Sequence, residues 1–342
     1  RSFGKHRKMF NIDSKVSRMA FCILFQATLA LGLISSGRAA QAQATYPDRP
    51  VRLVVPYATG GNADLQSRII AQKLGEALGQ QFVVDNRAGA TGIIGTDIAA
   101  KALPDGYTLL FIASPHAINP GLFATLPFDP VRDFAPISLV GSTPLIISVT
   151  SALPAKTIKE LVALAKTKPG QLNYASAGSG GPGHLAGALF NTVTGVNIVH
   201  VPYKGTAQAL TDLMSGQMHL MYPSATSVLP YIKNGRIRGL AITGRQRSAR
   251  APELMTALEA GLPGYEASIW NGILAPARTP QTMVNRVHRA LVNIIGMPDV
   301  RDRIIGLGAD PMTSTPAEFE VFIAAEIKKW SQGIKDSGAR VD

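Results

Sequence analysis

The chain has 342 residues, one cysteine and a net charge of +12, from 34 Lys and Arg against 22 Asp and Glu. An apolar fraction of 46% with only 16% charged residues excludes a wholly disordered chain, and the length allows two or three domains. The single cysteine excludes a disulfide framework and a metal site built from cysteines. Because such a positive balance is typical of nucleic-acid or membrane-surface binding, the position of the charge decides its meaning.

The first 44 residues have the pattern of a secretory signal peptide. They carry seven basic residues and one acid, followed by an apolar run from Ala20 to Ile34. That run is shorter than the roughly 20 residues of a membrane-spanning helix, and it leads to a small-x-small cleavage pattern ending at Ala42 or Ala44. We therefore expect export and cleavage near one of these alanines; an uncleaved N-terminal anchor is the alternative. Cys22 would leave with the peptide, and a cysteine-free mature chain fits the bacterial periplasm.

The mature chain contains one pattern of strands and helices twice. Apolar runs predict the strands, and apolar residues at helical spacing predict the helices. The first copy begins with a strand (Val51–Val55), a glycine turn (Pro56–Gly61) and a helix (62–79). It continues with a strand (Phe82–Val84), a loop (Asn86–Gly95), a helix (Thr96–Ala102) and a strand (Tyr107–Ala113). The second copy repeats this order at Leu172–Ala175, Ser176–Gly183, His184–Thr192, Ile198–Val201, Tyr203–Gly205, Ala207–Met214 and Met218–Tyr222.

Two such units predict an α/β fold with two doubly wound, Rossmann-like lobes. Apolar stretches at Ile137–Val149 and Trp270–Ala275 would carry the chain between the lobes. We therefore expect lobe 1 to comprise residues 45–142 and 272–342, and lobe 2 to comprise residues 143–271. Helices predicted at Met283–Ile295, Val300–Gly306 and Pro316–Lys335 would complete lobe 1.

The glycine loop of the second copy carries the pattern G-x-G-x-x-G at Gly178, Gly180 and Gly183. A dinucleotide site needs an acid about 20 residues further on, but residues 184–211 contain none, so no such cofactor is predicted. Free N–H groups at a helix start bind an anion without needing that acid, and this function is favoured over a tight turn without a ligand. Gly60 and Gly61 form the partner loop of lobe 1, where Asp64 is expected to cap N–H groups rather than to do chemistry.

The sequence signals for a catalytic or metal-binding site are weak. Ser179 misses the G-x-S-x-G pattern of a hydrolase at its first glycine, and the mature-chain histidines lack the spacing of a metal site. His116 and Asn119 follow the third strand, at the end of the sheet where ligands bind, and His184 begins the helix after the second glycine loop. For His116 and His184, ligand contact and a capping or packing role are both open. No metal, no cofactor and no enzymatic activity are predicted.

The charge of the mature chain lies on lobe 2. Residues 143–271 carry 11 basic and 5 acidic residues, whereas the rest of the mature chain is neutral. The excess is concentrated in an acid-free run from Leu213 to Pro252 that contains few aromatic residues for stacking on bases. Nucleic acid is therefore not predicted as a partner, and a solvated face, steering of an anionic ligand or docking of a partner remain open.

With these motifs the chain resembles the Bug/TctC family, the extracytoplasmic solute receptors of tripartite tricarboxylate transporters, over essentially the whole mature chain from Tyr46. The stretches that carry the resemblance are Val54–Gly61, Asp85–Ala90, Pro104–Leu110, His116–Pro120, Pro169–Ser176, His200–Gly205 and Glu259–Gly264. The resemblance implies a monomeric periplasmic binding protein of the Venus-flytrap type. It would close on a small mono- or dicarboxylate and deliver it to a membrane permease, without catalysis.

The resemblance also implies a site between the two glycine loops, where backbone N–H groups and waters hold a carboxylate. The expected ligand-binding residues are Tyr57, Ala58, Thr59, Gly60, Gly61, Asp64, His116, Asn119, Ser176, Ala177, Gly178, Ser179, Gly180, His184, Tyr203 and Lys204. The chain departs from the family at Pro223–Thr226, where an acidic or Asn-rich turn is common, which suggests a less polar or bulkier distal end of the ligand. A sensory receptor for a signalling partner is the main alternative, and a periplasmic hydrolase using Ser179 is a further one.

Overall fold

The computed structural model describes residues 46–248 and 250–338, so the predicted signal peptide and its cleavage site lie outside the described residues. The strands are β1 (Val51–Val55), β2 (Phe82–Asn86), β3 (Thr108–Ala113), β4 (Phe134–Pro144), β5 (Ile146–Thr150), β6 (Asn173–Ser176), β7 (Val199–Pro202), β8 (Leu220–Met221), β9 (Ile237–Ile242), β10 (Ser268–Pro276) and β11 (Asp310–Pro311). The helices are α2 (Asn62–Leu78), α3 (Ile93–Ala100), α4 (Pro115–Leu122), α5 (Ile158–Thr167), α6 (Pro182–Thr194), α7 (Thr206–Ser215), α8 (Ala225–Lys233), α9 (Gln281–Gly296), α10 (Pro298–Gly306) and α11 (Pro316–Ser337). A 3₁₀ turn, η1 (Ala90–Gly92), precedes α3.

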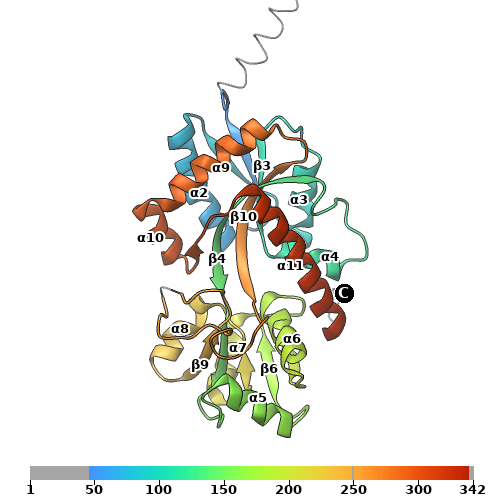
Figure 1. The fold of residues 1–342 in the computed structure, drawn as a ribbon, viewed down its shortest axis with the longest axis vertical. Helices are drawn as coiled ribbons and strands as arrows, with labels where there is room; N and C mark the ends of the chain where they lie inside the picture. Colours follow the sequence, from blue (N-terminus) through green and yellow to red (C-terminus); the bar gives the residue numbers. More distant parts are fainter. Residues whose placement is uncertain (1–45, 249, 339–342) are drawn as a thin grey trace, which may run out of the picture. The chain divides into compact units, whose positions relative to one another are not determined.

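These strands form two sheets with helices packed on them (Figure 1). The first sheet has the order β11-β4-β10-β3-β1-β2, and the second has the order β7-β6-β8-β5-β9. In each sheet the first strand of the repeated pattern has two parallel neighbours: β1 lies between β2 and β3, and β6 lies between β7 and β8. In the first sheet β10 is antiparallel to both β3 and β4. In the second sheet β5 is antiparallel to both β8 and β9. The predicted α/β fold with two lobes is confirmed.

The chain passes between the two sheets at the predicted apolar stretches. Only Leu145 separates β4 of the first sheet from β5 of the second, and the chain returns to the first sheet at the start of β10. The two passages are tied together by Thr243, whose hydroxyl accepts the N–H of Leu145 at 2.9 Å and whose carbonyl accepts the N–H of Ala267 at 3.2 Å. The lobe boundaries at residues 142 and 272 stay a prediction, since β4 continues past residue 142 and β10 begins before residue 272.

Helix α11 packs on α4, β4 and also α6, so it contacts elements attached to both sheets (Figure 1). A buried carboxylate fixes it to the returning strand: Glu326 Oε2 accepts the indole N–H of Trp270 at 2.9 Å and that of Trp330 at 2.8 Å. Lys329 pairs with the other oxygen of the same carboxylate. Because a buried charge is tolerated only when it is paired and hydrogen-bonded, this arrangement stabilises the packing of α11 on β10.

Most arginines of the basic run of the second lobe have bonding partners, although Arg245 and Arg247 remain exposed. Arg238 donates to the carbonyl oxygens of Leu153, Ala155 and Ser151, at 3.0, 3.1 and 3.2 Å. Arg250 donates to the carbonyl of Ile305 at 2.6 Å. Two further arginines form ion pairs, Arg245 with Glu266 and Arg247 with Glu259. Four of the six basic side chains in this run therefore hold backbone or pair with acids, which leaves less charge for steering an anion.

The predicted strands and helices are present, and some boundaries differ. The helix after the second glycine loop begins at Pro182, two residues before the predicted start, because proline has no N–H to satisfy and suits the first helical turn. The segment His116–Asn119, which the family resemblance implied to be a loop lining the cleft, lies inside α4, which also opens on a proline, Pro115. Among the described residues, no helix is both long enough and apolar enough to cross a membrane.

Candidate ligand-binding site

The two glycine loops have nearly the same backbone at their last two residues. The first glycine loop (residues 56–61) joins β1 to α2, and the second (residues 176–181) joins β6 to α6. Gly60 and Gly180 both have left-handed backbones, with φ of 81° and 74°. Each is followed by a glycine at the N-cap, Gly61 with φ −73° and ψ 165° and Gly181 with φ −75° and ψ 165°. The repeat seen in the sequence is therefore also a repeat of geometry.

Glycine at both N-caps leaves the starts of α2 and α6 without a capping side chain. Two other helices of the chain are capped: Thr157 accepts the N–H of Glu160 at the start of α5, and Thr315 forms a capping box with Glu318 at the start of α11. Gly61 and Gly181 cannot do this, because they have no side chain. The first-turn N–H groups of α2 and α6, at the positive end of each helix dipole, thus remain to bind an anion.

The side chain four residues after the left-handed glycine holds the first loop. Asp64 Oδ2 accepts the N–H of Gly60 at 2.9 Å, and Oδ1 accepts the side-chain amide of Asn86 at 2.9 Å. Arg68 Nε lies 3.1 Å from both carboxylate oxygens. Burial by itself would raise the pKa of Asp64, but the hydrogen bonds from Arg68, Gly60 and Asn86 lower it below its ordinary value. Asp64 thus binds an N–H group, as predicted, but that group belongs to Gly60 in the loop and not to the first turn of α2, and the carboxylate is fully buried.

The second loop is held in the same way by a different residue. Gly180 donates its N–H to His184 Nδ1 at 3.0 Å, again four residues further on. The ring of His184 stacks on the ring of His200 with centroids 3.7 Å apart and planes at 8°. His200 Nε2 lies 2.7 Å from Ser176 Oγ, at the other end of the loop. Burial lowers the pKa of both histidines, and that of His200 falls to about 4 with a further contribution from His184.

Asn119 holds a strained turn next to the first loop. Ala90 and Thr91 of η1 have positive φ values of 45° and 52°, which is costly for residues with a Cβ and most of all for a β-branched one. The side-chain amide of Asn119 donates to the carbonyl of Thr91 at 3.1 Å, and its oxygen accepts the Thr91 hydroxyl at 3.0 Å. The buried Asn119 therefore fixes this turn at the carboxyl end of β2.

Tyr57 and His116 serve the scaffold. Tyr57 accepts the N–H of Ala113 on its hydroxyl at 3.0 Å, and burial raises its pKa. His116 donates from Nε2 to the carbonyl of Pro130 at 2.8 Å and packs against Phe128 and Phe134, and burial lowers its pKa to about 4. For His116 the packing role, left open by the sequence, is the one observed.

Residues after β7 complete the second loop. The N–H of Tyr203 donates to the carbonyl of Ser176 at 2.9 Å, and its hydroxyl donates to Asp212 at 2.7 Å. Lys204, Ala177 and Ser179 are exposed beside it. The departure at Pro223–Thr226 forms the start of α8, where the Thr226 hydroxyl reaches the carbonyl of Gly308 at 3.5 Å.

Sequence reasoning missed three residues that hold the glycine loops, Arg68, Asn86 and His200, and Thr91, which bonds to Asn119 in the neighbouring turn. Asn86 could have been found, because it ends β2 at the carboxyl edge of the sheet, where ligand sites form. His200 carries no such local signal. It meets the loop because β6 and β7 pair in parallel with Tyr174 opposite His200.

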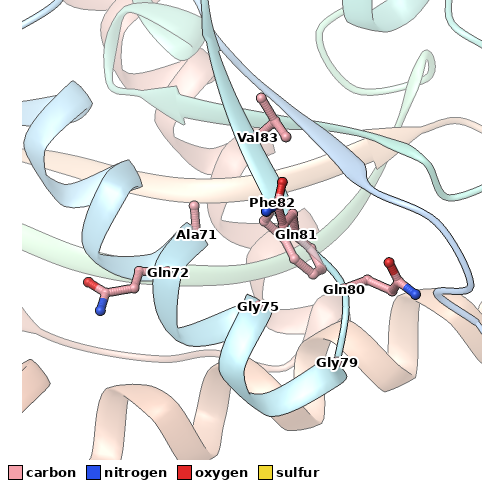
Figure 2. A pocket seen from close by; sticks show the side chains of 8 residues that line it. All are labelled: Ala71, Gln72, Gly75, Gly79, Gln80, Gln81, Phe82 and Val83. Atoms are coloured by element: carbon pink, nitrogen blue, oxygen red, sulfur yellow. The ribbon is translucent and has the colours of Figure 1, made fainter.

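The described residues also form two surface cavities away from these loops. One, of ≈ 510 Å³, lies between the end of α2 and the start of β2, and its lining residues are labelled in Figure 2. The other, of ≈ 550 Å³, is lined by residues between Pro120 and Asp133. None of the predicted ligand-binding residues lines either one. Within the described residues, no group of His, Cys, Asp and Glu side chains gathers that could hold a metal ion.

A family model described as "Tripartite tricarboxylate transporter family receptor", TctC, matches residues 66–339. The chain belongs to the TctC family. Three solved structures are similar to this TctC-family chain. The first is R. palustris Rpa4515 with adipate, 36% identical with a TM-score of 0.68, covering 86% of this chain and 100% of that one. The second is the periplasmic binding protein BugD, 34% identical with a TM-score of 0.65, covering 86% of this chain and 100% of that one. The third is MatC from Rhodopseudomonas palustris with bound malate, 31% identical with a TM-score of 0.65, covering 84% of this chain and 100% of that one.

Membership of the TctC family confirms the resemblance drawn from the sequence and makes this chain a solute-binding receptor of a tripartite tricarboxylate transporter. The similar structures cover 86% and 84% of this TctC-family chain.

Proposed function

We propose that this TctC-family receptor binds a small mono- or dicarboxylate in the periplasm, with a carboxylate held by the N–H groups of the two glycine loops. The observation that carries the proposal is the pair of uncapped helix starts with matching left-handed glycines, Gly60 and Gly180. Adipate and malate in the similar structures support this ligand class.

Backbone N–H groups suit this ligand because they offer a positive potential without a mobile side chain. A hydrogen bond to a charged group contributes roughly 1.5–3 kcal/mol net. Several such bonds, reduced by the cost of association, support affinity on the order of micromolar. Ligand bound to both loops would favour the closed form, which the proposed partner, a tripartite-type permease, could select.

A catalytic function is not supported by the hydroxyl groups near the site. Ser176 lies at a nucleophile-to-base distance from His200, but it is buried and its hydroxyl also bonds to the carbonyl of Gly178 at 2.9 Å. Among the described residues, no carboxylate hydrogen-bonds to that imidazole to orient it as a base, and no hydrogen bond links Ser179 to a histidine. We therefore propose binding without chemistry.

The proposal is tested by thermal unfolding of the mature protein with a panel of carboxylates that includes adipate and malate. A ligand that binds only the folded state raises the unfolding temperature. We expect a shift with at least one carboxylate and none with the corresponding amide. No shift with any member of the panel would contradict the proposal.

Variants then locate the carboxylate. Gly60→Val and Gly178→Val should abolish the shift, because a branched side chain blocks the approach of a ligand to the loop backbone. Gly264→Val is the matched control, since Gly264 also has a positive φ, 80°, but lies in a turn outside both loops. It should lower the unfolding temperature while keeping the ligand-induced shift. Shifts that persist in both loop variants would place the carboxylate elsewhere.

A further inference from the structure

The second glycine loop is tied at both ends to a pair of stacked imidazoles. Gly180, at its C-terminal end, donates to His184, and Ser176, at its N-terminal end, lies in hydrogen-bond contact with His200. The two rings are in face-to-face contact, with centroids 3.7 Å apart. The loop and the rings thus form one closed unit from Ser176 to His184.

The hydrogen bonds define the protonation state of both rings. A backbone N–H can only donate, so His184 Nδ1 must be an unprotonated acceptor and the single proton of that ring lies on Nε2. The Ser176 hydroxyl donates to the carbonyl of Gly178 at 2.9 Å, so its oxygen accepts the proton-bearing Nε2 of His200. The ring of His184 is therefore neutral, with its proton on Nε2. For His200 the bond shows that Nε2 carries a proton, and the neutral state follows from its close stacking on the His184 ring.

The surroundings of the rings favour this neutral state. The titratable group that contacts them from β6 is Tyr174, with ring centroids 5.0 Å from His200 and 6.5 Å from His184. The hydroxyl of Tyr174 donates to the carbonyl of His184 at 3.1 Å. The nearby Asp212 of α7 bonds to the hydroxyl of Tyr203. Among the described residues, no carboxylate bonds to either ring, so a charge there would have no counter-ion in direct contact.

We propose that His184 and His200 are positioning residues of the carboxylate site, and that the second glycine loop binds ligand only while both rings are neutral. The inference rests on the proposed function, since it concerns the same loop. Protonation of His184 at Nδ1 turns the acceptor of the Gly180 N–H into a donor and breaks that bond. Protonation of His200 puts a charge against the stacked ring without a partner. The first event releases the loop at Gly180, and the second destabilises the ring stack that holds it, so acidification weakens ligand binding.

The opposite outcome has an equally clear physical basis. A cationic imidazole near a carboxylate would attract it, so affinity would rise as the rings gain protons. The sign of the pH dependence therefore separates positioning by a neutral pair from direct attraction by a cation.

The first experiment needs no ligand. Nitrogen-15 NMR of the imidazoles in the mature protein should show His184 and His200 as neutral Nε2–H tautomers at pH 6. On further acidification, the Gly180 amide resonance should move together with the His184 ring. A doubly protonated ring at pH 6, or an Nδ1–H tautomer of His184, would overturn the inference whether or not the protein binds carboxylates.

The second experiment uses conservative variants. His184→Asn keeps an acceptor close to the position of Nδ1, and His200→Gln keeps an N–H donor close to the position of Nε2, whereas leucine removes either function. With adipate or malate as probe at pH 7.5, we expect Kd within about threefold of wild type for the Asn and Gln variants, and at least about tenfold weaker binding for the Leu variants, as loss of one to two hydrogen bonds implies.

A control and a pH series complete the test. His288→Leu removes a histidine of α9 that bonds to the carbonyl of Ser314 at 3.0 Å, and it should leave Kd unchanged. The wild type should lose more affinity between pH 7.5 and 4 than the His184→Asn/His200→Gln double variant, which corrects for protonation of the ligand itself. Leu variants that bind as wild type, or wild-type affinity that rises relative to the double variant, would overturn the inference. If the wild type binds neither probe, the proposed function fails for these ligands, and the NMR result still decides the state of the rings.

Discussion

The two glycine loops share the backbone geometry of their last two residues, but they are held by opposite chemistry. In the first, the N–H of Gly60 is accepted by the carboxylate of Asp64, which is paired with Arg68. In the second, the N–H of Gly180 is accepted by a neutral imidazole, His184, stacked on His200. The difference shows that the repeat requires an acceptor four residues after the left-handed glycine, and that the charge of this acceptor is free to vary.

The largest expected effect is on the free energy of unfolding, and it distinguishes the charged acceptor of the first loop, Asp64, from the neutral acceptor of the second, His184. Asp64→Ala leaves the Gly60 N–H, the Asn86 amide and Arg68 without their acceptor, and should lower the free energy of unfolding by about 3 kcal/mol, at the low end for a broken buried pair because Arg68 is half exposed. His184→Ala should cost about 2 kcal/mol, since it breaks one hydrogen bond and a ring stack.

Urea denaturation of both variants measures this difference, with Asp64→Asn as the control that keeps an acceptor and removes the charge. An equal decrease in the free energy of unfolding for the two alanine variants would show that the charge of Asp64 contributes nothing to stability.

The next effect concerns the space around the two left-handed glycines. A Cβ on Gly60 would have no neighbour within 4 Å, whereas a Cβ on Gly180 would lie 3.2 Å from Leu122 Cδ1. Gly60→Ala should therefore cost only the left-handed strain, about 1 kcal/mol, and Gly180→Ala about 2 kcal/mol. The double variant with Leu122→Ala tests the contact: there the Gly180→Ala substitution should cost no more than Gly60→Ala. An unchanged cost in that background would contradict the role of Leu122.

Acid should weaken the two loops at different pH. The pKa of His200 is lowered from 6.5 to about 4 in the folded state, so its stabilising effect is complete above pH 6.5 and is lost as the pH falls from 6.5 towards 4. The pKa of Asp64 is lowered below 3.8, so its contribution is lost only below pH 3.8. Hydrogen exchange of the loop amides should show protection of Gly180 falling about tenfold at pH values where Gly60 is still protected, as loss of one hydrogen bond implies. Simultaneous loss would contradict separate anchors.

The smallest effect tests the strained turn that has no counterpart in the second lobe. Ala90 has φ 45°, while the corresponding loop after β7 contains Gly205 in an extended conformation. Ala90→Gly removes the strain and adds some unfolded-chain entropy, so it should raise the free energy of unfolding by about 0.5 kcal/mol. Thermal unfolding measures this increase in stability. Ala124→Gly, outside the turn, is the control and should not increase the stability of the protein.

Local patterns were enough for much of the fold and for both glycine loops. The strands at Val51–Val55 and Thr108–Ala113 and the helices after Pro280 follow from hydrophobic periodicity, because burial on one face is written into neighbouring residues. The starts of α2 and α6 follow from Gly61 and Gly181, because glycine at an N-cap leaves the helix start open. Asp64 was also recognised as a cap, because its bond to Gly60 spans only four residues.

Other features depend on residues that are distant in the sequence. Asn119 was expected at the ligand, but it bonds to Thr91, 28 residues away, after the chain has crossed from β2 to α4. The sequence left open whether the basic run forms a solvated face, and four of its arginines bond to carbonyls or acids elsewhere in the chain, such as Arg250 to Ile305. No local pattern reveals such partners.

The sequence by itself determined two repeated α/β units, each with a glycine loop before an uncapped helix, and the family to which they belong. It also divided the +12 charge, half of it in the first 44 residues and the rest in the second lobe. Only the tertiary structure decided what that second half does and how each loop is held. The reason is physical: turn geometry and helix capping act over a few residues, whereas ion pairs, ring stacks and strand register form between segments that meet only after folding.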